Sequence, residues 1–504
     1  MGLSRRRLLQ VGAAAAVGAG DPLPGLAAAS GRSGSFDRDL KALASDLRGR
    51  IVLPGDPGYA YAAWPNNARW ADVHPRAIVM CASESDVRAC ITLARETGIP
   101  FAIRSGGHNY AGFSTTDGLL IDVKAMNGVT IDAKNGLVTA AAGTSNQDMA
   151  DALRGTGFAV PSGRCPTVGT SGLVLGGGWG FAATKAGLTC DSLVSTAVVT
   201  ADARTRVAQD GPGGTDDLFW AARGGGGGNF GVHTAFTFRL HEVSDVTTFN
   251  IVWPAERQVE LMLALQAIQL GNPTTLSTRT KVAPARAGVP TRGDLKVQTY
   301  GLYWGSPAAL REVMAPAFTL AAPGVAEITG MSYWAARDYL VTDDPLGMYD
   351  IRSRYVERGL SGEALETMLT WMTRWPGGSV RQDNMGILFA IGGKVKEKRP
   401  TDTAYVHRQA DFIFEMETAW GAIDTPEVVA RQLAWLAEYF EAMQRFVIPQ
   451  SYVNFPSRDL PNWKLAYYGE NLPRLCAVKR KYDPDNLFRF PQSIPLSDLS
   501  SAAE

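Results

Sequence analysis

"RSGGHNYAG", residues 104–112, places His108 and Asn109 directly behind two glycines, in a chain of 504 residues with five histidines. Glycine has no side chain and tolerates positive φ, so consecutive glycines let the backbone approach a bulky anion and present N–H groups to it. The stretch therefore suits a loop that holds a pyrophosphate. A tight turn with a hydrogen-bonded histidine explains these residues equally well when they are taken alone.

A second glycine-rich stretch, "GRCPTVGTSGLVLGGGWG" at residues 163–180, contains Cys165. A Rossmann fingerprint would close the first strand of a βαβ unit and precede an acidic residue by about 20 positions, whereas these glycines lie in mid-chain. No histidine stands near Cys165 at metal or nucleophile spacing, which argues against a protease-like pair. A thiolate that attacks an electron-poor ring needs such an exposed loop. A third stretch, "RGGGGGNFG" at residues 223–231, is either a linker or a backbone surface for a nucleotide, and its structured flanks favour the second.

The residues before the first glycine loop predict a strand, a helix and a second strand. From Arg76 an apolar run precedes Ser83 or Ser85 as a helix cap, then helical apolar spacing, Gly98 as a stop, and another apolar run. Short strands with turn signals follow, and a helix is expected from Ser145 to Thr156.

The composition shifts near Val243, and beyond it helical and strand patterns alternate, as in a second α+β domain. The segment "DFIFEMETAW" at residues 411–420 alternates strictly, so one strand face is acidic. That face carries Asp411, Ile413, Glu415 and Glu417. A solvent-facing edge strand is an equally good explanation of this pattern.

Length and composition predict two domains with substantial cores, since the chain has a mass of 54.0 kDa and 45% apolar residues. Basic and acidic residues balance at 49 each, with no basic run beyond the N-terminus, so no nucleic-acid partner is expected. The five cysteines indicate neither a disulfide framework nor a metal site. Cys81 and Cys90 could form a disulfide, although their apolar neighbours favour buried thiols.

Residues 1–30 resemble a twin-arginine signal peptide, with "SRRRLL" before a short apolar stretch and small residues. A membrane anchor is the alternative, but the apolar stretch is too short to cross about 30 Å of hydrocarbon. We therefore expect the Tat export machinery as a partner, a secreted protein at the cell surface or outside the cell, and no stable membrane insertion.

Together with "GLTCDSL", "LFWAARGGGGGNFGVHTAF" and "YYGENLPRLCAVKRKYDPDNLFRFPQSI", the two quoted loops carry a resemblance. The chain resembles the berberine-bridge-enzyme-like FAD-linked oxidases of the vanillyl-alcohol-oxidase superfamily. The match runs from about Arg76 to Ile494; it is dense in the first half and thin between residues 246 and 380.

The resemblance implies an α+β, two-domain FAD-linked oxidase fold. A PCMH-type FAD-binding domain would span residues 31–245, an antiparallel-sheet substrate-binding domain residues 246–455, and a C-terminal segment, 456–497, would return to the FAD-binding domain. It also implies a bicovalent FAD, with His108 bonded to the 8α-methyl group and the sulfur of Cys165 to ring carbon 6.

The resemblance further implies roles for individual residues. The expected cofactor-binding residues are Arg104, Ser105, Gly106, Gly107, His108, Asn109, Cys165, Val168, Gly169, Gly172, Gly176, Gly177, Gly178, Trp179, Gly180, Gly228, Val232 and Asn454. Glu415 matches a catalytic base of the family, and Glu417 is the second choice. Tyr110, Trp179 and Asn454 would orient the substrate, whereas Tyr452 and Tyr468 are interpreted as core aromatics.

The chain departs from bacterial relatives that oxidise alcohols or sugars. Where they carry an acidic residue or tyrosine before "GGKV" and a tyrosine in "Y-x-N-Y", this chain has Phe389 and Phe455. Neither phenylalanine can move a proton. This favours dehydrogenation or oxidative cyclisation of an aromatic or polyketide-like substrate.

We therefore expect an exported FAD-dependent oxidase, as a monomer or homodimer, acting on a small organic molecule. The substrate would give a hydride to flavin N5, and O2 would be reduced to H2O2. The alternatives are an oligosaccharide or alcohol oxidase, which an open, tryptophan-lined groove would favour, and a flavin-binding protein that has lost catalysis.

Overall fold

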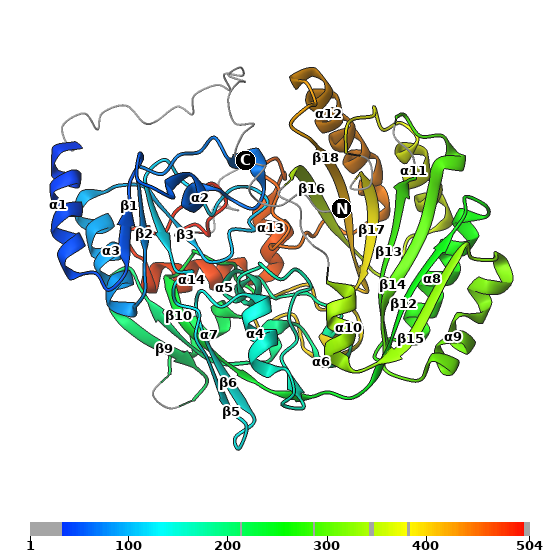
Figure 1. The fold of residues 1–504 in the computed structure, drawn as a ribbon, viewed down its shortest axis with the longest axis horizontal. Helices are drawn as coiled ribbons and strands as arrows, with labels where there is room; N and C mark the ends of the chain where they lie inside the picture. The colour runs from blue at the N-terminus through cyan, green and yellow to red at the C-terminus, as the bar shows by residue number, and fades with distance from the viewer. Residues whose placement is uncertain (1–32, 212–213, 286–287, 342–346, 381–383, 498–504) are drawn as a thin grey trace.

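The computed structural model describes residues 33–211, 214–285, 288–341, 347–380 and 384–497, so the expected signal peptide lies outside the described residues. Figure 1 shows two halves side by side: the N-terminal elements with α13 and α14 in one, and a large sheet with outer helices in the other. The α+β, two-domain architecture expected from the sequence is confirmed.

The first sheet has the strand order β1-β2-β4-β3 and contains the predicted strand-helix-strand. Ser83 is the cap of α3, since its hydroxyl accepts a hydrogen bond from the Asp86 N–H at 3.3 Å, and Gly98 ends the helix with φ 67°. The strand β4 lies between β2 and β3 and is parallel to both. The elements are α1 (Ser33–Asp46), β1 (Arg50–Val52), α2 (Tyr59–Ala63), β2 (Ala77–Met80), α3 (Glu84–Thr97), β3 (Phe101–Arg104) and β4 (Leu119–Asp122).

A second, antiparallel sheet has the order β5-β6-β10-β8-β9. The helix predicted to reach Thr156 ends at Leu153, because Gly155 and Gly157 adopt φ near 80°. The elements are β5 (Val129–Asp132), β6 (Leu137–Ala141), α4 (Asn146–Leu153), β7 (Phe158–Ala159), α5 (Thr170–Leu175), α6 (Ala183–Ala186), β8 (Leu193–Val199), β9 (Thr205–Gln209), α7 (Asp216–Ala222), β10 (Val232–Arg239) and β11 (His241–Glu242), which pairs with β7.

The second half is built on a seven-stranded antiparallel sheet with the order β15-β12-β14-β13-β17-β18-β16. The helices α8, α9, α11 and α12 cover its outer face, so its inner face is turned toward the first half (Figure 1). The strands are β12 (Val246–Trp253), β13 (Leu276–Pro284), β14 (Leu295–Tyr303), β15 (Val325–Met331), β16 (Met348–Val356), β17 (Met385–Ala390) and β18 (Phe412–Trp420). The helices are α8 (Gln258–Gly271), α9 (Pro307–Leu320), α10 (Tyr333–Leu340), α11 (Gly362–Met372) and α12 (Pro426–Met443).

The C-terminal helices α13 (Trp463–Tyr468) and α14 (Leu472–Tyr482) pack against the first half. Lys479 Nζ donates a hydrogen bond to the Asn229 carbonyl at 2.8 Å, and the Ile494 N–H donates to the Asn229 side chain at 2.8 Å. The end of the chain therefore holds the third glycine loop in place.

The thiols of Cys81 and Cys90 are both buried and 3.9 Å apart, as free cysteines. Among the described helices, none is long and apolar enough to cross a membrane.

A buried ion pair joins the two halves. Arg408 donates to both carboxylate oxygens of Asp191 at 2.8 Å, and the side chains are 0% and 6% exposed. Burial opposes the charge on Arg408, but Asp191 outweighs this effect and raises the pKa of the guanidinium above its usual value.

We expect Asp191→Ala to lower the free energy of unfolding by about 3–5 kcal/mol, because it leaves the Arg408 charge buried without a counter-charge. Thermal and chemical denaturation would measure the loss. The control is Glu397→Ala, which removes an exposed pair with Lys394 and should cost about 1 kcal/mol or less. If the two variants lose the same free energy of unfolding, the buried pair contributes no more to stability than an exposed one.

Candidate active site

A cavity of about 1290 Å³ lies between the glycine loops of the first half and the inner face of the seven-stranded sheet. Both halves and the C-terminal segment contribute lining residues. The volume exceeds that of an ordinary single-ligand pocket, so the cavity has room for a large cofactor and a substrate together.

The His108 and Cys165 loops touch each other at two glycines. A Cβ atom on Gly106 would lie 2.2 Å from the Gly169 backbone nitrogen, so neither loop could approach as closely with a larger residue. His108 Nε2 lies 2.8 Å from the Thr167 hydroxyl, two residues beyond Cys165. The fold thus brings together the two side chains that the sequence singles out, although they are 57 positions apart in the chain.

Cys165 also differs from the other four cysteines. It is partly exposed and lines the cavity, whereas Cys81, Cys90, Cys190 and Cys476 are buried. Burial, with a smaller contribution from Asp191, raises the pKa of the Cys190 thiol to about 12, which makes this second thiol of the region unreactive.

Most of the predicted cofactor-binding residues line the cavity. They are Ser105, Gly106, Gly107, His108, Asn109, Cys165, Val168, Gly169, Gly172, Trp179, Gly228, Val232 and Asn454. A Cβ atom on Gly172 would meet nothing within 4 Å, so this position opens onto free space.

The side chain of Arg104 is directed away from the cavity. It is fully buried, and its guanidinium donates to the carbonyls of Ala62, Ala63 and Ser114 at 2.7, 3.1 and 2.9 Å. Arg104 therefore supports the loop from behind and is not among the residues that line the cavity.

The remaining predicted glycines have packing roles outside the cavity lining. An added Cβ would lie 2.0 Å from Asn454 Oδ1 at Gly176 and 1.9 Å from the Ser162 carbonyl at Gly180. An added Cβ would lie 2.9 Å from the Tyr405 ring at Gly177 and 2.4 Å from the Thr189 hydroxyl at Gly178. These glycines allow the 163–180 loop to fold tightly beneath the cavity.

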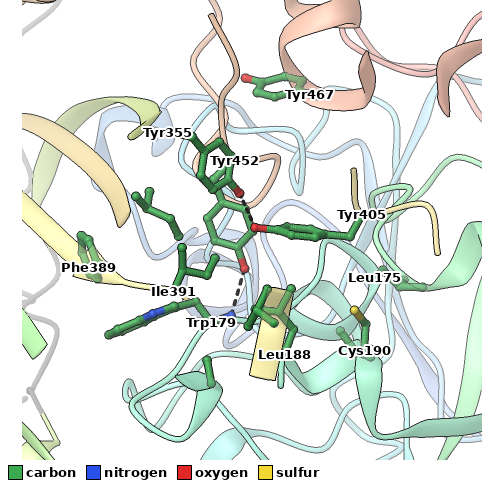
Figure 2. Close-up of a cluster of buried hydrophobic side chains, with 14 of the residues drawn as sticks. Leu175, Trp179, Leu188, Cys190, Tyr355, Phe389, Ile391, Tyr405, Tyr452 and Tyr467 are labelled. Carbon is green, nitrogen blue, oxygen red and sulfur yellow. Dashed lines mark hydrogen bonds between the residues drawn. The ribbon is translucent and has the colours of Figure 1, made fainter. Parts of the chain in front are cut away.

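Tyr452 fixes the same loop from the core (Figure 2). Its hydroxyl accepts hydrogen bonds from the backbone N–H groups of Gly178 and Trp179 at 3.0 Å and from the Asn454 amide at 3.2 Å. Burial raises the pKa of Tyr452 to about 12. Tyr468 is also buried. Both tyrosines are buried, as expected from the sequence, but both also line the cavity.

An FAD molecule fits the chemistry of this cavity. Two buried polar atoms on its wall, Ser114 Oγ and Gln492 Oε1, have no hydrogen-bond partner among the described residues. The glycines at 226–228 bring bare backbone to the wall. Backbone N–H groups and unpartnered polar atoms of this kind suit a dinucleotide, and His108 and Cys165 lie where they could hold its ring.

The opposite wall is the inner face of the sheet, and both Glu415 and Glu417 lie on it. The strand β18 pairs with β16 on one side and β17 on the other, so the edge-strand explanation of the acidic pattern is wrong. Glu415 is 3% exposed, with Oε1 3.9 Å from Arg279 Nη2. Asp411 precedes the strand and binds Lys396 at 2.7 Å instead of lining the cavity.

Aromatic side chains line the region between the two walls. Phe389 meets Trp179 edge-on at 4.8 Å and Phe455 at 5.6 Å, and Phe455 stacks on Tyr110 at 5.4 Å. The two phenylalanines thus line the cavity at the positions where the alcohol- and sugar-oxidising relatives carry proton-transferring groups.

Polar residues of β12, β13 and β14 that were not predicted from the sequence share this wall. They are Asn250, Arg279, Lys281, Gln298 and Tyr300. The only signal was spacing: Arg279 and Lys281 are two positions apart, as are Gln298 and Tyr300, so within each strand the two long side chains share one face.

The fold and the glycine-lined cavity define an FAD-binding oxidoreductase. Residues 75–209 match the family model of the FAD binding domain, and residues 451–495 match the model described as berberine and berberine like. The chain is 32% identical over 459 residues to the FAD-linked oxidoreductase YvdP of Bacillus subtilis, with 90% of this chain and 99% of the relative covered.

Two further matches extend the comparison. The monolignol oxidoreductase AtBBE-like 13 of Arabidopsis thaliana is 27% identical, with 92% of this chain and 88% of the relative covered. The solved structure of BBE-like 1 from Physcomitrella patens is 27% identical with a TM-score of 0.81, covering 91% and 99% of the two chains. The chain belongs to the berberine-bridge-enzyme-like FAD-linked oxidoreductases of the vanillyl-alcohol-oxidase superfamily.

Proposed function

We propose that this oxidoreductase is an oxidase: a small organic substrate gives up a hydride and a proton, and O2 is reduced to H2O2. The single observation that carries the proposal is the shared cavity, in which His108 and Cys165 face an aromatic cluster and a polar sheet wall. The oxidation is a dehydrogenation or an oxidative cyclisation.

FAD, when bound, supplies the chemistry of accepting a hydride at N5 and passing electrons to O2. His108 and Cys165 would hold it covalently at the 8α-methyl group and carbon 6. Trp179, Phe389 and Tyr110 would pack against the flat face of the substrate and exclude water from it.

A group on the polar sheet wall must take the proton that leaves with the hydride. Glu415 is the candidate from the sequence, with Glu417 second, and both line the cavity. Asn454 is a positioning residue, since its amide donates to the Leu173 carbonyl at 2.9 Å and to Tyr452.

An aromatic substrate suits the cluster of Tyr110, Phe389 and Phe455, and the Arabidopsis relative is named for monolignols. A second candidate is a carbohydrate, because Trp64 and Trp420 also line the cavity and Trp64 is 45% exposed. We also propose that the protein is exported by the Tat machinery and acts as a monomer or homodimer.

The test is a panel of aromatic alcohols, phenols and oligosaccharides, measured both as anaerobic bleaching of the flavin absorbance and as peroxide release in air. Bleaching with peroxide release supports an oxidase, and the responding class identifies the substrate. Bleaching without peroxide would point to another electron acceptor. A flavin that no substrate bleaches would support a binding protein without catalysis.

We expect Glu415→Gln to slow flavin bleaching at unchanged flavin content, because the amide can neither accept the proton nor balance Arg279. Asp411→Asn is the matched control, since it lies just before the same strand but outside the cavity. Unchanged turnover in Glu415→Gln would remove this residue from the mechanism.

A further inference from the structure

Tyr300, Arg279 and Phe389 lie side by side in one row across the inner face of the sheet. In the strand register Tyr300 pairs directly with Arg279, and Arg279 pairs directly with Phe389. Directly paired residues of antiparallel strands point to the same face, and all three line the cavity. A tyrosine therefore stands two strands away from Phe389, which cannot transfer a proton.

The guanidinium of Arg279 is held among these residues. It donates a hydrogen bond to the Tyr300 hydroxyl, lies 4.9 Å above the centre of the Phe389 ring, and has Nη2 3.9 Å from Glu415 Oε1. The flat phenylalanine ring provides a surface across which the arginine side chain reaches from Tyr300 toward Glu415. Arg279 is only 6% exposed, so solvent screens these interactions weakly.

The charges facing Tyr300 favour its ionised form. Burial raises the pKa of the hydroxyl, but the positive charges of Arg279, Arg164 and Lys281 outweigh burial and lower it below its usual value. The facing groups are Arg279 and Lys281 on β13, Arg164 beside Cys165, and Glu415 and Glu417 on β18, while Asn250 on β12 is uncharged. The Tyr300 hydroxyl thus loses its proton more easily than an ordinary tyrosine.

We propose that Tyr300 is the catalytic residue that accepts the substrate proton, that Arg279 positions its hydroxyl, and that Glu415 balances the arginine charge. This inference rests on the proposed oxidase function and replaces the choice among the carboxylates with a specific acceptor. The substrate class follows from it: the proton comes from a hydroxyl group, as in an alcohol or a phenol.

The step balances as follows. The substrate C–H bond breaks with its electron pair, which leaves as hydride to the flavin, while the substrate O–H proton goes to the Tyr300 oxygen. The substrate loses two electrons and two hydrogens and becomes a carbonyl or a quinone-methide-like product. The same two hydrogens and two electrons leave the enzyme in H2O2, which restores the ionised tyrosine.

Tyr300→Phe tests the proposal in the flavin-loaded protein. Flavin bleaching by the responding substrate should slow by about 10²–10⁴-fold, with flavin content and visible spectrum unchanged. Tyr303→Phe is the matched control, because it removes a hydroxyl from the same strand at a position outside the cavity lining. Equal bleaching rates in the parent and Tyr300→Phe would overturn the proposal.

A second readout does not depend on turnover. An ultraviolet difference titration, parent minus Tyr300→Phe, reports the ionisation of this one hydroxyl. We expect ionisation below the usual tyrosine pH, and a shift to higher pH in Arg279→Met, since a merely structural arginine would leave the titration unmoved. A hydroxyl that ionises only at or above the usual pH would also overturn the proposal.

The two measurements separate this inference from the proposed function. In one outcome no substrate bleaches the flavin, but the titration shows a low Tyr300 pKa that depends on Arg279. The oxidase function is then wrong, and the interaction of Arg279 with an ionised Tyr300 exists but has no catalytic role. In the other outcome substrates bleach the flavin, and Glu415→Gln abolishes the bleaching whereas Tyr300→Phe does not. The oxidase function is then supported, and Tyr300 is not the proton acceptor.

Discussion

Replacing both His108 and Cys165 with alanine is expected to give a protein that releases all of its flavin when precipitated with acid, whereas the parent protein keeps its flavin in the pellet. The reason is the geometry of the two loops: they touch at Gly106 and Gly169, and both side chains line the same cavity. Peptide mass and pellet absorbance measure the result.

The single variants define each attachment separately. His108→Ala and Cys165→Ala should each keep flavin in the pellet through the remaining residue. Cys190→Ala serves as the control, since this buried thiol has a raised pKa and lies outside the cavity lining. If acid extracts the flavin of the parent protein completely, the covalent attachment is wrong, although a non-covalent FAD site would still stand.

Gly106→Ala should have the second large effect, a loss of most of the bound flavin and about 1–3 kcal/mol or more of stability. Its Cβ would lie 2.2 Å from the Gly169 nitrogen and 2.7 Å from the Thr167 carbonyl. Both are backbone atoms that cannot rotate away, so the two loops must separate and the His108 and Cys165 side chains must move apart.

Gly128→Ala is the matched control, because a Cβ at that position meets nothing within 4 Å and its φ is not in the left-handed region. Flavin content after gel filtration and the thermal midpoint of both variants measure the difference. A Gly106→Ala protein with full flavin content and parental stability would show that the loops do not need this contact.

Local signals predicted the elements around the first loop well. Ser83 and Gly98 delimit α3 as expected, since capping depends on residues that are close in sequence. Position 104 shows the limit of this reasoning. Strand alternation does not reveal which side of the sheet Arg104 faces, because that depends on carbonyls of residues 62, 63 and 114.

The sheet wall was predictable only in part. The alternation in residues 411–420 placed Glu415 and Glu417 on one strand face. It did not reveal whether that face belongs to a sheet edge or lines a cavity. The pair of Arg279 and Tyr300 depends on the register of β13 against β14, which a single sequence does not reveal. A resemblance to relatives pointed instead to positions 389 and 455, where this chain carries phenylalanine.

The anchoring of Asn229 by the last helix has a consequence for biogenesis. Phe488, Phe490 and Gln492 line the cavity, and the Ile494 N–H binds the Asn229 side chain in the third glycine loop. In a nascent chain that still lacks these residues, the FAD-binding site is incomplete. Cofactor loading is therefore expected to follow synthesis of residues 488–494, and ending the chain a few residues beyond Ile494 should be tolerated where removal of Phe488 onward is not.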